Sequence, residues 1–275
     1  MSIWEPELTC AAELARTAGA LVVAIRDRGF EHLAVEHKAG DEPVTVADRA
    51  ASDLVVSGLR RRFATDVIVS EEEPAGDARL TAERVWYVDP IDGTKDFIRG
   101  EDGFAVMIGL CVGARPLVGV VYQPTRDRLY RAAPDTGAWL EEGSAAARRL
   151  HVSDIDDPRA IRLVSSRSHR SEINDRVRES LGVTDELAIG SVGLKLGLIA
   201  LGERDLYVNP WPKCKAWDTC APEAILVAAG GTLTDTRGGA IRYDERELRR
   251  TRGLVASNGR VHAGALTRLA HLFPG

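Results

Sequence analysis

The stretch WYVDPIDGTKDF, residues 86–97, decides the fold. Its chemical question is why two aspartates and a lysine lie in a turn directly after an apolar strand. It opens with an apolar run typical of a strand, and the proline and Gly93 that follow exclude a helix interior. We therefore expect a strand that runs directly into a tight turn. That turn carries two aspartates, Asp89 and Asp92. Because Asp-Pro and Asp-Gly are ordinary turn dipeptides, their meaning depends on the residues that accompany them.

Around this stretch, the N-terminal half of the chain predicts two helices followed by a run of strands. Apolar residues recur at helical spacing over residues 7–28 and 47–63. Short β-branched runs bounded by Gly, Pro and Asp then predict strands within DVIVSEEE, VWYVDP, AVMIGLCV, PLVGVVYQP and RLYRAAP. This order of elements is an α+β layout.

In the second half of the chain, predicted strands and helices alternate. After a polar stretch at residues 141–149, strands are expected in IRLVSS, LAIGSV and DLYVNP, and helices in SEINDRVRESLG, LKLGLIALGE and PEAILVAAGG. We divide the chain into residues 1–150 and 151–275. Since no internal repeat or low-complexity linker separates the halves, we expect them to pack together with a ligand site at their junction.

Composition narrows the classes of function. The 275 residues include 36 basic and 41 acidic side chains, which gives a net charge of −5. This net negative charge argues against a protein that binds polymeric nucleic acid through its phosphates. A small anionic ligand remains possible, because a local basic pocket can exist on an acidic protein. The four cysteines lack zinc spacing, the N-terminus lacks an apolar h-region, and no run of 18 apolar residues occurs. We expect a reduced, cytoplasmic chain without a membrane anchor.

Acidic residues gather where predicted strands end and predicted helices begin: Asp48, Glu71, Glu72, Asp89, Asp92 and Asp218. Each has a simpler interpretation as well. The glutamates at 71–73 suit a solvated loop, Asp48 suits a helix-start charge, and Asp218 suits a helix N-cap.

Taken together, these carboxylates suit hard divalent cations. Mg²⁺ prefers oxygen ligands and shares substrate phosphates, and the lack of His or Cys favours Mg²⁺ or Mn²⁺ over zinc. Two metals roughly 4 Å apart can activate water and stabilise a leaving oxygen in phosphoryl transfer. Asp89, which lies between the others in sequence, is expected to bridge them.

The motifs EE, WYVDPIDGTKDF and AWDTCAPEAILVAAGG resemble those of the inositol monophosphatase superfamily, whose members are Mg²⁺-dependent, Li⁺-sensitive phosphatases. The resemblance covers nearly the whole chain and implies a layered α-β-α-β-α sandwich. It implies two or three bound ions, with Mn²⁺ as an alternative. The metal ligands that it implies are Glu71, Asp89, the carbonyl of Ile91, Asp92 and Asp218. It also implies that Asp48 and Thr94 activate the attacking water.

Three segments of the second half resemble the CysQ-like 3'(2'),5'-bisphosphate nucleotidase branch, which converts adenosine 3',5'-bisphosphate to AMP and supports sulfur metabolism. They are SSRSH, SVGLK and PWPKCKAWDTCAPEAIL, the last with Lys213 and Lys215. A helix N-terminus with a lysine one turn in suits a second phosphate. The substrate-binding residues implied are Gly93, Thr94, Ser166, His169, Ser191, Lys195 and Asp218.

Simpler interpretations and competing functions stay open. Lys213 and Lys215 suit a solvated loop, and the serines suit a cap. His37 and Lys38 stand near the place of a family lysine, and neither is assigned. An inositol or sugar monophosphatase is the alternative enzyme, disfavoured because YVNPWPKCKAWD lacks an acid before the W-D pair. A non-catalytic binding module is a remote third. We expect a small-molecule nucleotide partner and a monomer or homodimer.

Overall fold

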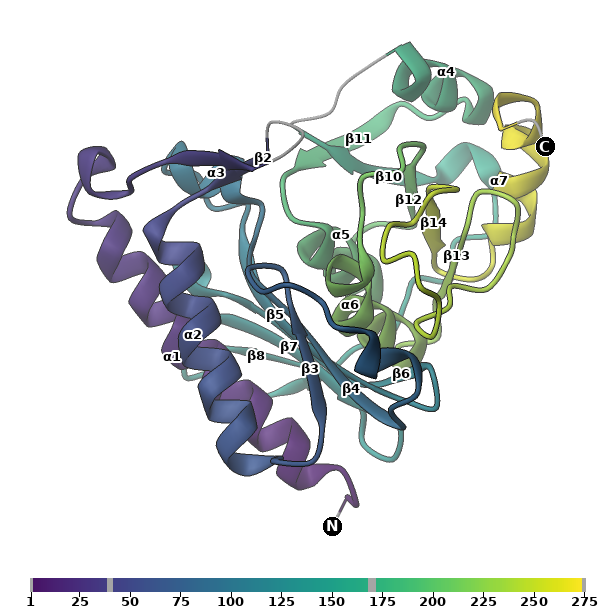
Figure 1. Ribbon diagram of the computed structural model, residues 1–275. Helices are drawn as coiled ribbons and strands as arrows, with labels where there is room; N and C mark the ends of the chain where they lie inside the picture. The colour runs from purple at the N-terminus through teal and green to yellow at the C-terminus, as the bar shows by residue number, and fades with distance from the viewer. Residues whose placement is uncertain (1, 39–41, 168–171, 274–275) are drawn as a thin grey trace.

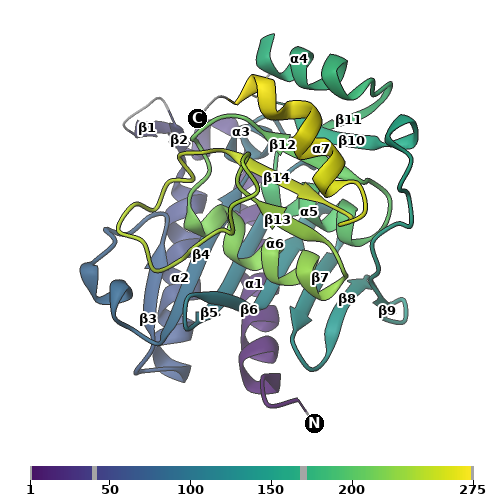
Figure 2. The same cartoon turned by 90° about the vertical axis from the view of Figure 1, so that its right-hand side faces the viewer.

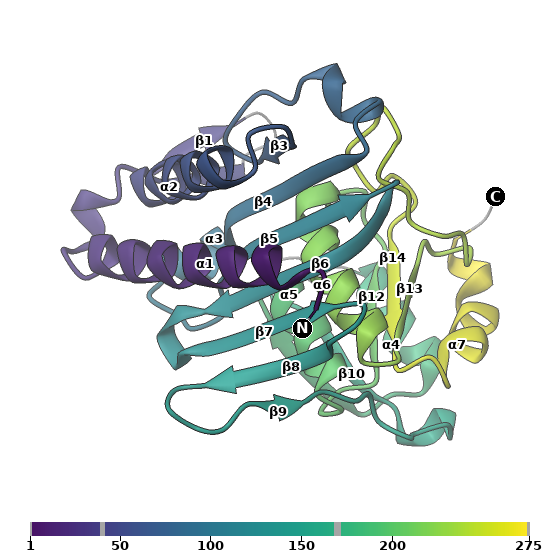
Figure 3. The ribbon, with the colours of Figure 1, turned by 90° about the horizontal axis from the view of Figure 1, so that it is seen from below.

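The computed structural model describes residues 2–38, 42–167 and 172–273. It stacks helices and sheets in five layers, helix, sheet, helix, sheet and helix, and so confirms the expected α-β-α-β-α sandwich (Figure 1). The layers are seen edge-on from below, with α1 and α2 on one outer side and α4 and α7 on the other (Figure 3).

The larger sheet is built by the first half of the chain. Its strand order is β3-β4-β5-β6-β7-β8-β9, parallel between β3 and β4 and antiparallel elsewhere. The strands are β3 (Val67–Ser70), β4 (Arg84–Asp92), β5 (Ala105–Val112), β6 (Arg115–Gln123), β7 (Arg128–Ala133), β8 (Gly137–Glu142) and β9 (Arg148–Arg149). The last two strands enter the stretch at 141–149, for which the polar composition predicted no strand.

Two long helices, α1 (Glu5–Arg26) and α2 (Val46–Arg62), cover the outer face of this sheet. Their apolar stripes pack on β4, β5 and β6 in one large core cluster. By length and hydropathy alone α1 could cross a membrane. Its buried side chains, which include Leu8, Ala15 and Val22, are instead covered by this core.

The second sheet has the order β11-β10-β12-β14-β13, with β10 parallel to both of its neighbours. Its strands are β10 (Arg162–Ser166), β11 (Asp185–Ile189), β12 (Leu206–Asn209), β13 (Thr232–Thr234) and β14 (Leu254–Ser257). Helices α5 (Val192–Ala200) and α6 (Ala216–Ala228) fill the space between the two sheets, and α4 (Glu172–Leu181) and α7 (His262–Leu269) cover the far face (Figure 2).

Smaller elements complete the chain. They are the hairpin β1 (Glu36–Lys38) and β2 (Glu42–Val44), the helix α3 (Thr94–Ile98), and the 3₁₀ segments η1 (Phe30–His32), η2 (Asp77–Leu80), η3 (Pro124–Arg126), η4 (Pro158–Ala160) and η5 (Ala270–Leu272).

The segment that was expected to turn after Val88 instead stays in the sheet. Strand β4 continues to Asp92, which still pairs with Ala105, and the register shifts between Asp89 and Asp92. A bulge of this kind absorbs the proline without ending the strand and re-aims side chains. The chain turns only at Gly93, whose φ of +97° is a left-handed conformation, and α3 follows at once.

Close packing between α6 and the first sheet fixes the position of the start of α6. A Cβ on Gly109 of β5 would lie 2.6 Å from the backbone nitrogen of Ala221 in α6. Because no side chain intervenes, α6 lies directly on the sheet. This contact brings the start of α6, with Asp218, beside the end of β4.

Candidate active site

Three carboxylates from three elements meet at the end of β4. Glu71 follows β3, Asp89 lies in β4, and Asp218 lies in the first turn of α6, and one oxygen of each lies within 4.8 Å of the others. The parallel pairing of β3 with β4 accounts for the first two, because the Glu71 N–H donates to the carbonyl of Val88 (3.1 Å). The sequence predicted this convergence.

The cluster has an excess of buried negative charge. Burial raises the pKa of Asp89 well above its usual range, and the neighbouring Glu71, Asp92 and Asp218 raise it further. Burial, with Glu71 and Asp92, raises the pKa of Asp218 to about 8. Carboxyl groups with pKa values raised in this way ionise only when a counter-charge is supplied, and a bound divalent cation can supply it.

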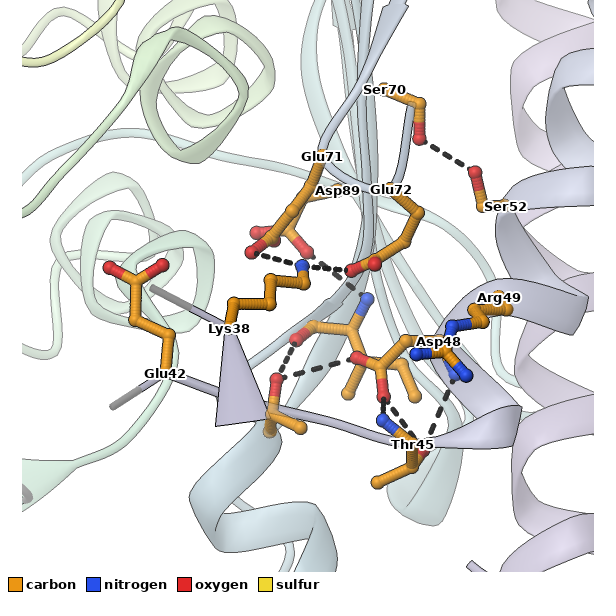
Figure 4. Close-up of polar contacts among 12 residues, drawn as sticks. Lys38, Glu42, Thr45, Asp48, Arg49, Ser52, Ser70, Glu71, Glu72 and Asp89 are labelled. Carbon is orange, nitrogen blue, oxygen red and sulfur yellow. Dashed lines mark hydrogen bonds and ion pairs between the residues drawn. The ribbon is translucent and has the colours of Figure 1, made fainter. Parts of the chain in front are cut away.

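Lys38 is the nearby cation that the sequence left unassigned. Its Nζ lies 3.2 Å from Glu71 Oε1 and 2.5 Å from Glu72 Oε1, as Figure 4 shows. Glu72 therefore faces the lysine, and Glu73 pairs with Arg60 (2.9 Å). Of the three consecutive glutamates, only Glu71 contributes to the carboxylate cluster, as the sequence analysis preferred.

Two aspartates occupy equivalent places at helix starts. Asp48 and Asp218 are the third residues of α2 and α6, and each accepts a hydrogen bond from the backbone N–H three residues earlier, at 2.7 Å from Thr45 and 2.8 Å from Lys215. The interpretation of Asp218 as an N-cap is therefore wrong by three positions. This bond holds one carboxylate oxygen, Oδ2, and leaves Oδ1 available in both residues.

The available oxygen of Asp48 lies beside Thr94. Thr94 Oγ1 is 3.4 Å from Asp48 Oδ1 and donates to the carbonyl of Ile91 at 3.0 Å. Burial raises the pKa of Asp48 to about 7, against the lowering effect of its hydrogen bonds with Thr45. The pair that the resemblance assigned to water activation is therefore in mutual reach.

Asp92 takes a different place from the other predicted ligands. Its Oδ2 accepts hydrogen bonds from the Ser191 hydroxyl (2.5 Å) and from the Gly193 N–H (2.8 Å), which belong to the turn that opens α5. Burial raises its pKa, although Lys195 nearby opposes the shift. Ser191, expected to bind substrate, thus also holds a predicted metal ligand.

Lys195 does not extend toward open space as a phosphate-binding lysine would. It is fully buried, and its Nζ donates to the carbonyls of Gly190 (2.5 Å) and Ser191 (2.9 Å) above the ring of Tyr207. Burial lowers its pKa to about 8. Its role in substrate binding stays a prediction, although it lines the same cavity as the carboxylates.

A cavity of about 210 Å³ opens above the cluster and draws its walls from both halves of the chain. Predicted site residues that line it are Glu71, Asp89, Ile91, Asp92, Gly93, Thr94, Ser166, Lys195 and Asp218. Residues with no role predicted from the sequence also line it, among them Glu42, Asn209 and Trp211. His169 lies outside the described residues.

Comparison with known families identifies the chain. The profile described as "Inositol monophosphatase family" matches residues 4–272. The chain belongs to the inositol monophosphatase family.

Curated members of this family include similar proteins named 3'(2'),5'-bisphosphate nucleotidase CysQ. The one from Salmonella typhimurium is 38% identical over 86% of this chain and 93% of its own, and the one from Escherichia coli K12 is 37% identical over the same shares. Inositol monophosphatase 3 of Solanum lycopersicum is 30% identical over 90% of this chain and 92% of its own.

Solved structures of family members share the fold. CysQ from Bacteroides thetaiotaomicron matches with a TM-score of 0.79 and 28% identity, over 94% of this chain and 99% of that chain. An inositol monophosphatase from Thermotoga maritima matches with a TM-score of 0.80 over 96% of both chains, at 24% identity.

Of the two lysines that the sequence left unassigned, Lys38 and Lys215, only Lys38 had a signal in the sequence. Lys38 stands ten residues before Asp48, one place from the position where the family pattern suggests a lysine, and this offset left it unassigned. Lys215 carries an ion pair with Glu42 (2.8 Å) and lies over the Trp217 ring, so it is not a solvated loop lysine. No short motif marks a contact between residues 173 positions apart.

Proposed function

We propose that this protein is a Mg²⁺-dependent 3'(2'),5'-bisphosphate nucleotidase that hydrolyses the 3'-phosphate of adenosine 3',5'-bisphosphate to give AMP and phosphate. One observation carries the proposal. A carboxylate cluster and Thr94, whose hydroxyl lies within reach of Asp48, line one cavity in a chain 37–38% identical to CysQ nucleotidases over most of its length. The proposal includes a cytoplasmic location and a monomer or homodimer.

Family membership implies a divalent metal cofactor, and the residues present fit one. Glu71, Asp89 and Asp218 bring oxygen donors together, without His or Cys, at a place where their own charges repel. Asp92 and the carbonyl of Ile91 complete the proposed ligand set. When bound, the metal ions supply the positive charge that lowers the pKa of water and stabilises the leaving oxygen. We propose two or three Mg²⁺ ions, for which Mn²⁺ can substitute.

We assign the transfer of the proton from the attacking water to Thr94 and Asp48. Thr94 Oγ1 lies between Asp48 and the carbonyl of Ile91, so its hydroxyl can pass a proton to the carboxylate as it accepts one from water. Asp48 is held in place for this by Thr45, which binds its other oxygen through both N–H and hydroxyl at 2.7 Å. The Thr45 bonds fix the direction in which Oδ1 points.

The second phosphate and the nucleoside are assigned to the C-terminal half. Ser166 is the last residue of β10, Lys213 and Lys215 precede Asp218, and all three line the cavity. We include His169, Ser191 and Lys195 in the proposed substrate site, together with Gly93 of the first half, and His169 is assigned from sequence alone. A bisphosphate needs a cation beyond the metal ions, and Lys213, which is exposed and lines the cavity, can provide one.

Phosphate release from adenosine 3',5'-bisphosphate and from inositol 1-phosphate, measured side by side, tests the proposal. We expect preference for the nucleotide, dependence on Mg²⁺, loss with EDTA and inhibition by Li⁺. Asp92→Asn should abolish turnover while the protein remains folded, and near-normal activity of that variant would contradict the metal assignment.

An inositol or sugar monophosphatase is the second candidate, favoured by the 30% identity to inositol monophosphatase 3. Preference for inositol 1-phosphate in the same assay would select it and leave the metal chemistry in place. Lack of turnover on both substrates would favour a non-catalytic binding module.

A further inference from the structure

An exposed indole stands in the loop between β12 and α6. Trp211 keeps 37% of its surface exposed, which is unusual for a large aromatic side chain. The other large apolar side chains exposed in the described part of the chain are Ile3, Phe30, Leu187 and Val227. Of this group, Trp211 alone lines the cavity above the carboxylate cluster.

The loop holds the backbone of Trp211 in a fixed place. The backbone N–H of Trp211 donates to the side-chain oxygen of Asn209 (3.1 Å), and the Asn209 amide nitrogen lies 2.9 Å from the Cys214 sulfur. Prolines stand on both sides of the tryptophan, at 210 and 212, and restrict the backbone further. A residue whose backbone is restricted in this way loses less conformational entropy when a ligand contacts its side chain.

Among the described residues that line the cavity, Trp211 has the most exposed aromatic ring. The other aromatic residues there, Tyr207 and Trp217, are 2% and 7% exposed, and of the aliphatic ones Ile91 and Val192 are buried and Pro43 is half-buried. A flat, uncharged ring that enters this cavity therefore finds its broadest stacking surface on Trp211.

A cation lies two residues from the indole. Lys213 is exposed and lines the same cavity, whereas Lys195 is committed to two backbone carbonyls. The loop thus combines the indole face of Trp211 with the exposed ammonium group of Lys213. A nucleoside phosphate presents the two complementary groups, a base that can stack and a phosphate that can pair with the ammonium. A polyol phosphate has no π-face to match the indole.

We propose that Trp211 is the stacking platform for the nucleobase, which makes this loop a determinant of specificity for nucleotides over phosphates that carry no base. The inference rests on the proposed function and names the contact that selects its substrate. Since stacking uses ring faces rather than base edges, this contact favours purines over pyrimidines by area and does not separate adenine from guanine.

The test compares ligands with and without a base. AMP and ribose 5-phosphate are titrated into wild type, Trp211→Ala, Trp211→Phe and the control Phe30→Ala by calorimetry with Mg²⁺ present. Phe30 is also an exposed aromatic residue, at 64%, and lies in η1 outside the cavity. For Trp211→Ala we expect AMP affinity to fall about 5- to 150-fold, the range of a lost stacking contact, and ribose 5-phosphate affinity to change less than about 3-fold. Trp211→Phe should fall between, and Phe30→Ala should match wild type.

Two outcomes overturn the inference separately from the proposed function. If wild type hydrolyses adenosine 3',5'-bisphosphate and Trp211→Ala weakens AMP and ribose 5-phosphate alike, or weakens neither, the stacking role is wrong and the proposed function stands. If wild type does not hydrolyse the nucleotide, both fail. Should Trp211→Ala fail to fold, as a thermal melt would reveal, Trp211→Phe supports the same comparison between the two ligands.

Discussion

Asp92 Oδ2 accepts a hydrogen bond from the Ser191 hydroxyl across 2.5 Å, and both side chains are buried. Asp92 ends β4 of the first sheet, and Ser191 caps α5, which belongs to the second half of the chain. The bond therefore joins the metal motif to the predicted substrate-binding turn. Any movement of α5 is transmitted to a predicted metal ligand.

Replacing Ser191 by alanine should therefore lower both stability and activity. Ser191 accepts a hydrogen bond from the Leu194 N–H as well as donating to Asp92, so Ser191→Ala removes a helix cap and a bond to a carboxylate. We expect the free energy of unfolding to fall by about 1–2 kcal/mol, from denaturant titration, and nucleotide turnover to fall about 10-fold.

A matched cap elsewhere provides the control. Asp157 caps the surface segment η4 by accepting from the Arg159 N–H, far in sequence from the site residues. Asp157→Ala should retain wild-type turnover. If Ser191→Ala lowers stability but not turnover, the bond to Asp92 has no part in holding the site.

Metal binding should stabilise the protein through Asp89. In wild type, Mg²⁺ binds the folded state, and at 100 times its dissociation constant it should add about 2.7 kcal/mol to the free energy of unfolding. Asp89→Asn should lose most of this increment. Because burial and neighbouring carboxylates raise the pKa of Asp89, its neutral replacement should unfold in EDTA at the same temperature as wild type or a higher one.

Thermal melts with Mg²⁺ and with EDTA measure this increment. Glu73→Gln is the matched control, because Glu73 is a neighbouring acid that pairs with Arg60 outside the cluster, and it should keep the full Mg²⁺ effect. An undiminished Mg²⁺ effect in Asp89→Asn would show that the metal binds elsewhere.

The hydroxyl of Thr94 should matter for turnover and not for metal binding. It lies between Asp48 and the Ile91 carbonyl, so Thr94→Ala removes the route for the proton. We expect turnover to fall about 100-fold or more, which is the usual size of a lost acid–base contribution. The Mg²⁺-dependent shift in the melting temperature should be retained.

Serine at position 94 tests whether the hydroxyl itself is responsible. Thr94→Ser keeps the hydroxyl and should retain turnover within about 10-fold of wild type. Equal losses in Thr94→Ala and Thr94→Ser would assign the effect to packing of the threonine methyl group.

The sequence predicted what depends on local chemistry and missed what depends on distant contacts. Asp89 and Asp218 could be placed together because each lies in a long motif at an element end. The continuation of β4 through Asp92 could not be predicted from the sequence. The pairing of Asp92 with Ala105 outweighs the local preference of the proline for a turn. The pairing of Lys38 with Glu71 likewise depends on where a hairpin lies in space.

A half-buried acid on α6, Glu223, makes the stability of the protein depend on pH. Tyr243 donates to Glu223 Oε2 at 2.6 Å, and Arg250 lies 4.4 Å above the Tyr243 ring. Burial raises the pKa of Glu223 from 4.5 to about 7 in the folded protein. Between pH 4.5 and about 7 the folded state binds more protons than the unfolded state, so the free energy of unfolding falls as pH rises. Above pH 7 the free energy of unfolding stays at this lower value.

Glu223→Gln should remove this loss, because glutamine stays neutral and still accepts from Tyr243. Relative to wild type, we expect the variant to have an equal free energy of unfolding near pH 4.5 and to be more stable at pH 8 by about 1–3 kcal/mol. Denaturant titrations at the two pH values measure the difference. Glu179→Gln, on the exposed side of α4, should show no such change with pH. If Glu223→Gln is destabilising at pH 8, the carboxylate is ionised in the folded state and held there by Arg250, which would reverse the assigned direction.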